Sequence, residues 1–255
     1  MTFSFEPATD TSIAEAPRGP GVLSLLVWIW VRPRRALEGV YAGRTWLFLI
    51  PLLIAVIVFA LNGIVQAPLQ AQITHQENLA RMREQIPPAE FANLPPEMLA
   101  APPPQPVVLT LLAALGPLLL AWFIRPAVLH LLGLLVGGQN SYSILLRMTA
   151  WASFPLILRA LLQTIYAGAT QQPVVGPGLS GLVGPGVLAA VLGQIDLFAL
   201  WYVALLGLAV AVSSRLSRNK ALLVTAIYVI LVLLLNVIPA LLANALTGGG
   251  SSFVP

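Results

Sequence analysis

Five apolar segments of membrane length leave few alternatives for the fold of this 255-residue chain. An apolar helix of about 20 residues crosses the hydrocarbon core of a bilayer, which is about 30 Å thick. Hydrophobic residues make up 58% of the chain and charged residues 9%, whereas soluble domains average about 45–50% and about 25%. The sequence therefore predicts an all-α polytopic membrane protein with five transmembrane helices. We expect them at about residues 46–65, 107–136, 148–167, 195–212 and 221–245.

The positions of the basic residues predict the orientation. If the N-terminus is cytosolic, nine basic residues lie inside the cell and only Arg81 and Arg83 lie outside, while Arg125 and Arg159 fall within apolar segments. An excess of basic residues on the cytosolic side is typical of membrane proteins, so we expect a cytosolic N-terminus and an external C-terminus. Twelve of the 13 basic residues are arginine, which favours a GC-rich bacterial source and thus the bacterial cytoplasmic membrane. The inside set is Arg18, Arg32, Arg34, Arg35, Arg44, Arg147, Arg215, Arg218 and Lys220.

The remaining segments are divided as follows. Residues 1–20 are polar and predict a disordered cytosolic tail, residues 21–246 form the membrane domain, and residues 247–255 predict a flexible tail. The outer loop, residues 66–106, begins with apolar residues at helical spacing, which predicts a short amphipathic helix. Its second half is rich in proline and predicts an extended spacer.

An apolar stretch at residues 21–31 is too short to span the bilayer. It carries Trp28 and Trp30, and Arg32, Arg34 and Arg35 follow it. Tryptophan favours the headgroup region and arginine favours anionic lipid. We expect an amphipathic helix that lies on the cytosolic leaflet, although the same residues could instead dock a partner protein.

Three sequence blocks resemble the membrane domain of the Yip family, named for interaction with Ypt/Rab GTPases. The blocks are WIWVRPRRAL, GGQNSYSILLRMTAWASFPLIL and IDLFALWYVALLGLAVAVSSRLSRNKALLVTAIYVIL, and the resemblance covers about residues 22–240. Gly137–Gly138 with Ser143 and Arg147, Pro155, and the Asp196–Trp201 segment carry most of it. The chain resembles a bacterial-type member, which implies five membrane helices, a cytosolic N-terminus and a non-enzymatic role in scaffolding, sorting or assembling membrane proteins.

Expected partners are the lipid bilayer and other membrane proteins, including a second copy of the chain. Eukaryotic Yip relatives act in vesicle traffic, but this chain has a 41-residue outer loop and lacks their long N-terminal cytosolic domain, so we do not expect a Rab-type GTPase. Nucleic acid is not expected either, because the basic residues form no continuous stripe.

Arg159 suggests a buried polar cluster. It lies 12 residues after Arg147, about 18 Å along a helix and near the middle of the membrane. An ionised arginine there needs a partner, so we predict that Arg159, Gln163, Asp196 and Asn236 hold the last three helices together. Two alternatives are a solute or proton path through the same residues and an Arg159 side chain that reaches the interface.

Small residues suggest close helix packing, within the chain or across a dimer. Gly133 and Gly137 form a G-x-x-x-G spacing, and Gly207 and Ala211 repeat it with smaller weight. Pro155 lies inside the third apolar segment.

Sequence signals for enzymes are weak. The chain has no cysteine and two histidines, and Asp196 is the single acid near an apolar span. Gly178–Gly181 resembles the G-x-S-G of intramembrane serine proteases, but no histidine follows it to act as the base. We expect no catalytic site, metal or cofactor. The alternatives to a scaffold are a small-solute transporter or channel with a polar path at Arg159 and Asp196, or an accessory subunit of a larger membrane complex.

Overall fold

A computed structural model of the chain describes residues 21–101, 103, 105–139, 141–174, 178–183 and 187–246. Every regular element in these ranges is helical, and five helical segments are long and apolar enough to cross a membrane. The predicted all-α fold with five membrane-length helices is confirmed. The predicted tails, 1–20 and 247–255, lie outside the described residues.

The five spans lie over the five predicted segments, but the first ends at Gln85 and not near residue 65. They are η1 (Thr45–Phe48) with α3 (Leu49–Gln85), α6 (Val107–Leu135), α7 (Tyr142–Ala152) with α8 (Phe154–Thr170), α10 (Leu197–Ser214), and α11 (Arg218–Leu246). The third span begins at Tyr142 rather than near Met148.

The third span, α7 with α8, is the central one. In its most apolar stretch 72% of the residues are buried, against no more than 44% in any other span. It packs against α3, α6 and α10. The two helices meet at Ser153, and Pro155 lies in the first turn of α8, where its missing N–H group costs little.

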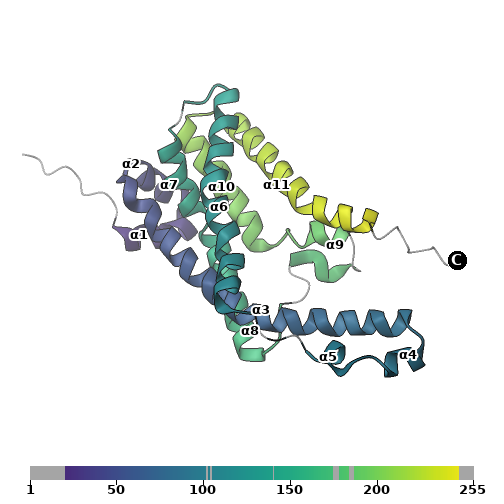
Figure 1. The fold of residues 1–255 in the computed structure, drawn as a ribbon. Helices are drawn as coiled ribbons and strands as arrows, with labels where there is room; N and C mark the ends of the chain where they lie inside the picture. The colour runs from purple at the N-terminus through teal and green to yellow at the C-terminus, as the bar shows by residue number, and fades with distance from the viewer. Residues whose placement is uncertain are drawn as a thin grey trace, which may run out of the picture.

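The predicted separation between the first span and an amphipathic helix is wrong. α3 is one helix of 37 residues, and the expected amphipathic helix is its C-terminal half. Pro68 lies inside α3, where it removes a backbone donor and crowds the preceding turn. This agrees with the change of direction that Figure 1 shows as α3 leaves the bundle.

The outer segment folds back on itself, and we call residues 66–99 the arm. Its proline-rich half is not fully extended, because two Pro-Pro pairs begin the short helices α4 (Pro88–Ala92) and α5 (Pro96–Leu99); proline presets the backbone of a first helical turn. The Arg83 guanidinium lies 5.2 Å from the centroid of the Phe91 ring. A ring nitrogen of His75 lies 3.2 Å from the Leu99 carbonyl oxygen. Figure 1 shows the arm projecting from the bundle.

The N-terminal segment is a pair of helices, not the single amphipathic helix that we predicted. Pro33 ends α1 (Val22–Val31) and begins α2 (Pro33–Ala42). α1 is apolar all round, with Leu25 buried and Leu23 exposed. α2 is the amphipathic member, and it buries Ala36, Leu37 and Val40 while its arginines are exposed. The pair packs through α2 against α7 and α10.

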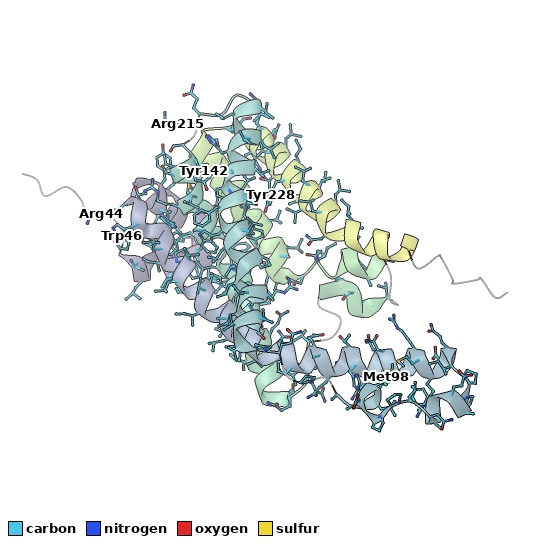
Figure 2. The ribbon with its side chains drawn as sticks, in the orientation of Figure 1. Arg44, Trp46, Met98, Tyr142, Arg215 and Tyr228 are labelled. Carbon is cyan, nitrogen blue, oxygen red and sulfur yellow. The ribbon has the colours of Figure 1, made fainter. Side chains whose placement is uncertain are left out.

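Two loops, which contain residues 136–139 and 215–217, meet at one end of the bundle, which we call the basic end. Lys220 Nζ donates to the Val136 carbonyl oxygen at 2.9 Å, and Gln139 N donates to Ser214 O at 3.2 Å. Figure 2 shows Arg215 at this end. The opposite end, the arm end, holds η2 (Gly178–Leu182) and α9 (Val187–Leu192).

Candidate functional site

The structure brings together Arg159 of α8 and Asp196 at the start of α10. Arg159 Nη1 and Asp196 Oδ2 are 2.9 Å apart, and the two side chains are 23% and 15% exposed. Asp196 is also the N-cap of α10, because its Oδ1 accepts a hydrogen bond from Ala199 N at 2.7 Å. One carboxylate thus satisfies a helix terminus and neutralises a mostly buried cation.

We had predicted this ion pair in the middle of the bundle, but it lies near the arm end. The central span begins at Tyr142, so Arg159 lies about 25 Å along it. The sequence estimate started at Arg147, which is itself five residues inside α7 and 7% exposed.

Gln163 and Asn236, the other two predicted members, do not join the pair. Gln163 is half-buried and makes no side-chain hydrogen bond to the part of the chain that the structure describes. Asn236 is exposed, and its amide donates to the Val232 carbonyl oxygen of its own helix at 2.9 Å. The polar link from the first span comes instead from Asn62, which donates to Ala160 O at 3.2 Å and to Thr164 Oγ1 at 3.0 Å.

A second polar site, which we call the Arg125 cluster, consists of Arg125, Ser153, Tyr202 and Tyr228. Arg125 Nε donates to the Tyr228 hydroxyl at 3.2 Å, and Nη1 donates to Ser153 Oγ at 2.9 Å. The guanidinium carbon lies 5.1 Å from the centroid of the Tyr202 ring. Figure 2 shows Tyr228 on α11, beside α6. The cluster therefore joins α6, the α7–α8 junction, α10 and α11.

The Arg125 cluster occupies the middle of the bundle. Each member lies 10 to 12 residues from the basic end of its helix, or about 15–18 Å, close to half of a core about 30 Å thick. An arginine at that depth costs about 2.5–3.5 kcal/mol on insertion scales. Two hydroxyls and an aromatic ring contact Arg125 and offset this cost. No carboxylate among the described residues takes part.

Sequence analysis did not assign a role to Arg125. In the structure Arg125 precedes the end of α6 by as many residues as Tyr228 follows the start of α11, but the predicted bounds of these two helices did not give this match. Serine and tyrosine carry no charge, so the sequence alone gave no electrostatic reason to single out these partners.

Buried donors of α7 fix the N-terminal helix pair to the bundle. Arg147 Nη1 donates to the Gly43 carbonyl oxygen, and Trp151 Nε1 donates to the Leu47 carbonyl oxygen at 3.1 Å. Arg147 and Trp151 are one helical turn apart, so they hold the connection between α2 and α3 against the central span.

The predicted docking residues lie on the outside of this pair. Arg32, Arg34 and Arg35 are exposed, Trp30 is 38% exposed and Trp28 is half-buried. Arg34 Nε contacts Glu38 Oε1 at 2.9 Å. Figure 2 shows Arg44 and Trp46 on the same flank, so the flank combines arginine with tryptophan as an interfacial surface does.

Of the predicted packing residues, Gly137 has a different role. Gly137 has φ +86°, its N–H donates to Leu134 O, and Gly138 N donates to Gly133 O at 2.8 Å. This is a Schellman motif that ends α6, so the G-x-x-x-G spacing does not represent helix packing at both glycines. Gly133 and Pro155 are buried.

Gly207 and Gly63 lie at contacts between helices, and at Gly63 the approach is too close for a Cβ atom. A Cβ atom on Gly207 would lie 3.4 Å from Thr225 Oγ1 of α11. A Cβ atom on Gly63 would lie 2.7 Å from Ala114 Cβ, so α3 and α6 meet there. The predicted packing residue Ala211 is half-buried.

An apolar groove of about 870 Å³ runs between α10 and α11, and we call it the α10–α11 groove. Gly207, Ala211 and Thr225 line it together with Arg34 of α2 and Arg218, which begins α11 at the basic end. Neither Arg159 nor Asp196 belongs to its lining.

The family model of the Yip1 domain matches residues 27–238. The chain belongs to the Yip1 family. No curated protein and no solved structure matches it. The Yip1 domain begins within α1 and ends within α11, so it holds all five spans, the Arg159–Asp196 pair and the Arg125 cluster. This Yip1-family protein is an integral membrane protein, and the Yip1 domain is not a known enzyme family. Among the described residues, no group of three or more His, Asp or Glu side chains could hold a metal ion.

Proposed function

We propose that this Yip1-family protein is a non-enzymatic scaffold that sorts or assembles other proteins in a bacterial cytoplasmic membrane, with the basic end in the cytosol. The arm is the observation that carries the proposal. The part of α3 after residue 65 extends about 30 Å, and α4 and α5 return along it. Met98, which Figure 2 shows on the arm, is 53% exposed. A folded element with exposed apolar side chains outside the bundle suits contact with a partner protein.

The ionisable residues inside the bundle support the same proposal. Arg159 and Arg125 each link different helices, and Arg147 links α7 to the connection between α2 and α3. Their side chains therefore serve helix packing in the resting structure, as polar residues do in other membrane bundles.

Site-specific crosslinking tests the proposal. A photoreactive residue at Met98 is expected to crosslink one protein in stoichiometric amount, and the same residue at Ala113, exposed on α6, is expected to capture lipid. Replacing residues 69–103 with a short Gly/Ser linker should abolish co-purification of that protein. Pro68 and Val107 line the same cavity, so a short linker can join the two helices. No protein adduct at Met98, or an unchanged set of bound proteins without the arm, would contradict the proposal.

A solute path is the second candidate, and Arg125 is the residue that favours it. Arg125 is a cation in the middle of the bundle with no carboxylate partner among the described residues, and ionisable residues within membrane spans commonly mark substrate or ion paths. Anion flux into liposomes that is lost in Arg125→Met would support transport over scaffolding. A crosslinked partner that belongs to a large complex would instead identify an accessory subunit.

A further inference from the structure

We propose that the α10–α11 groove binds one anionic glycerophospholipid from the leaflet at the basic end. An acyl chain lies along the groove, and the headgroup phosphate contacts Arg34 and Arg218. The inference goes beyond the proposed scaffold function, because it does not involve the arm or a protein partner.

The walls of the groove fit a hydrocarbon chain. Ala204, Gly207 and Ala211 of α10 face Ala221 and Ala226 of α11 across it, and these small residues give the groove its depth. Its polar Thr225 donates its hydroxyl proton to Ala221 O at 2.9 Å, so this hydroxyl needs no partner from the occupant.

The length of the groove favours a lipid over a transmembrane helix. On α10 the lining residues run from Leu200 to Val212, and on α11 they run from Arg218 to Ile230. Leu216, in the loop between the two helices, also lines the groove. Each stretch rises about 18 Å, which is close to the hydrocarbon depth of one leaflet, about 15 Å, and well short of the about 30 Å that a helix must cross.

The charges lie where a headgroup would lie. Arg34 comes from α2 and Arg218 is the first residue of α11, and both line the same groove. The positive end of the α11 helix dipole adds to their attraction for an anion, and arginine can hold a phosphate through two parallel hydrogen bonds. Glu38 contacts Arg34 Nε and reduces the net positive charge around Arg34. Selection of an anionic headgroup therefore depends on both arginines together.

Native mass spectrometry of the full chain tests the proposal. The purified protein is offered equal amounts of phosphatidylglycerol and phosphatidylcholine with identical acyl chains. Wild type is expected to retain one phosphatidylglycerol in preference. The double variant Arg34→Gln/Arg218→Gln should lower that retention about tenfold or more, since one basic residue near an anionic lipid is worth about fivefold. Arg35→Gln removes the same charge from α2 without altering the groove lining and should change little.

A second pair of variants tests the groove itself. Ala204→Phe fills it and should reduce retention of both lipids, whereas Ala113→Phe on exposed α6 should not. Equal retention of the two lipids by wild type, or unchanged preference in the double arginine variant, would overturn the proposal. A dimer that Ala204→Phe dissociates would show that a second copy occupies the groove, and this also overturns it. Thermal melting of each variant separates lost binding from lost folding.

Discussion

At the scale of single residues, Asp196 has two roles that substitution can separate. Asp196→Asn removes the charge but keeps a side chain that caps helices well, so it should lose the ion pair and retain the N-cap. Asp196→Ala loses both and leaves Arg159 unpaired. We expect Asp196→Ala to cost about 2–4 kcal/mol, with about 1 kcal/mol of it from the cap. Thermal melting in detergent measures the difference.

Arg159→Leu provides the control for the ion pair. It should be milder than Asp196→Ala and keep expression near wild type, because Asp196 retains its hydrogen bond to Ala199. The double variant Arg159→Leu/Asp196→Asn has no unpaired charge and should be more stable than Asp196→Asn alone. Additive losses in the double variant would show that the pair contributes nothing to stability.

Two tyrosines of the Arg125 cluster make a matched pair. The Tyr228 hydroxyl accepts a hydrogen bond from Arg125, whereas the buried Tyr202 hydroxyl faces Tyr228 but makes no hydrogen bond of normal geometry with the described residues. Tyr228→Phe should therefore destabilise the protein by about 1.5–3 kcal/mol. Tyr202→Phe keeps the ring over the guanidinium and should be neutral or stabilising. The opposite order of melting temperatures would contradict this account of the cluster.

At the scale of helices, the contact between α3 and α6 depends on Gly63. Gly63→Leu should separate the two helices, because a Cβ atom there would already lie 2.7 Å from Ala114 Cβ. Gly116→Leu is the control on the facing helix, since nothing lies within 4 Å of its added Cβ atom. We expect folded yield and melting temperature to fall in Gly63→Leu alone. Similar losses in both variants would mean that glycine content and not this contact decides stability.

The sequence predicted the helices where one physical rule dominated and missed them where two rules competed. Membrane length alone located the five spans, because lipid admits few other structures. It did not reveal that α3 continues through Pro68, since proline also suits a helix end. The spacing of Gly133 and Gly137 fits both close packing and a helix terminus, and only the backbone of Gly137 decides between them.

The same reasoning explains which part of the candidate site the sequence revealed. Arg159 required a partner, and Asp196 was the only acid near an apolar span, so their contact could be predicted from charge. Asn236 donates to a carbonyl of its own helix, and Gln163 carries no charge that requires a partner, so polarity alone did not locate them. Arg125 contacts hydroxyls and a ring, and these uncharged groups gave the sequence no electrostatic reason to pair them with Arg125.

At the scale of the whole molecule, the loops at the two ends differ in charge. Arg215, Arg218 and Lys220 lie at the basic end, and the arm carries four glutamates with two arginines. The positive-inside rule therefore favours a cytosolic basic end. Because five spans, an odd number, lie between α1 and the end of α11 in the described residues, this orientation also requires the C-terminal end of α11 to lie outside.

Single cysteines test this orientation directly, because the chain has none of its own. A membrane-impermeant thiol reagent applied to intact cells should label Glu90→Cys and Gln172→Cys, which lie at the arm end. Ser141→Cys and Ser217→Cys lie at the basic end and should react only after permeabilisation, since the bilayer separates them from the reagent. The reverse pattern would place the arm in the cytosol, where its exposed Met98 could meet only cytosolic or inner-surface partners. Labelling of all four positions in intact cells would mean that the five helices do not form a sealed membrane domain.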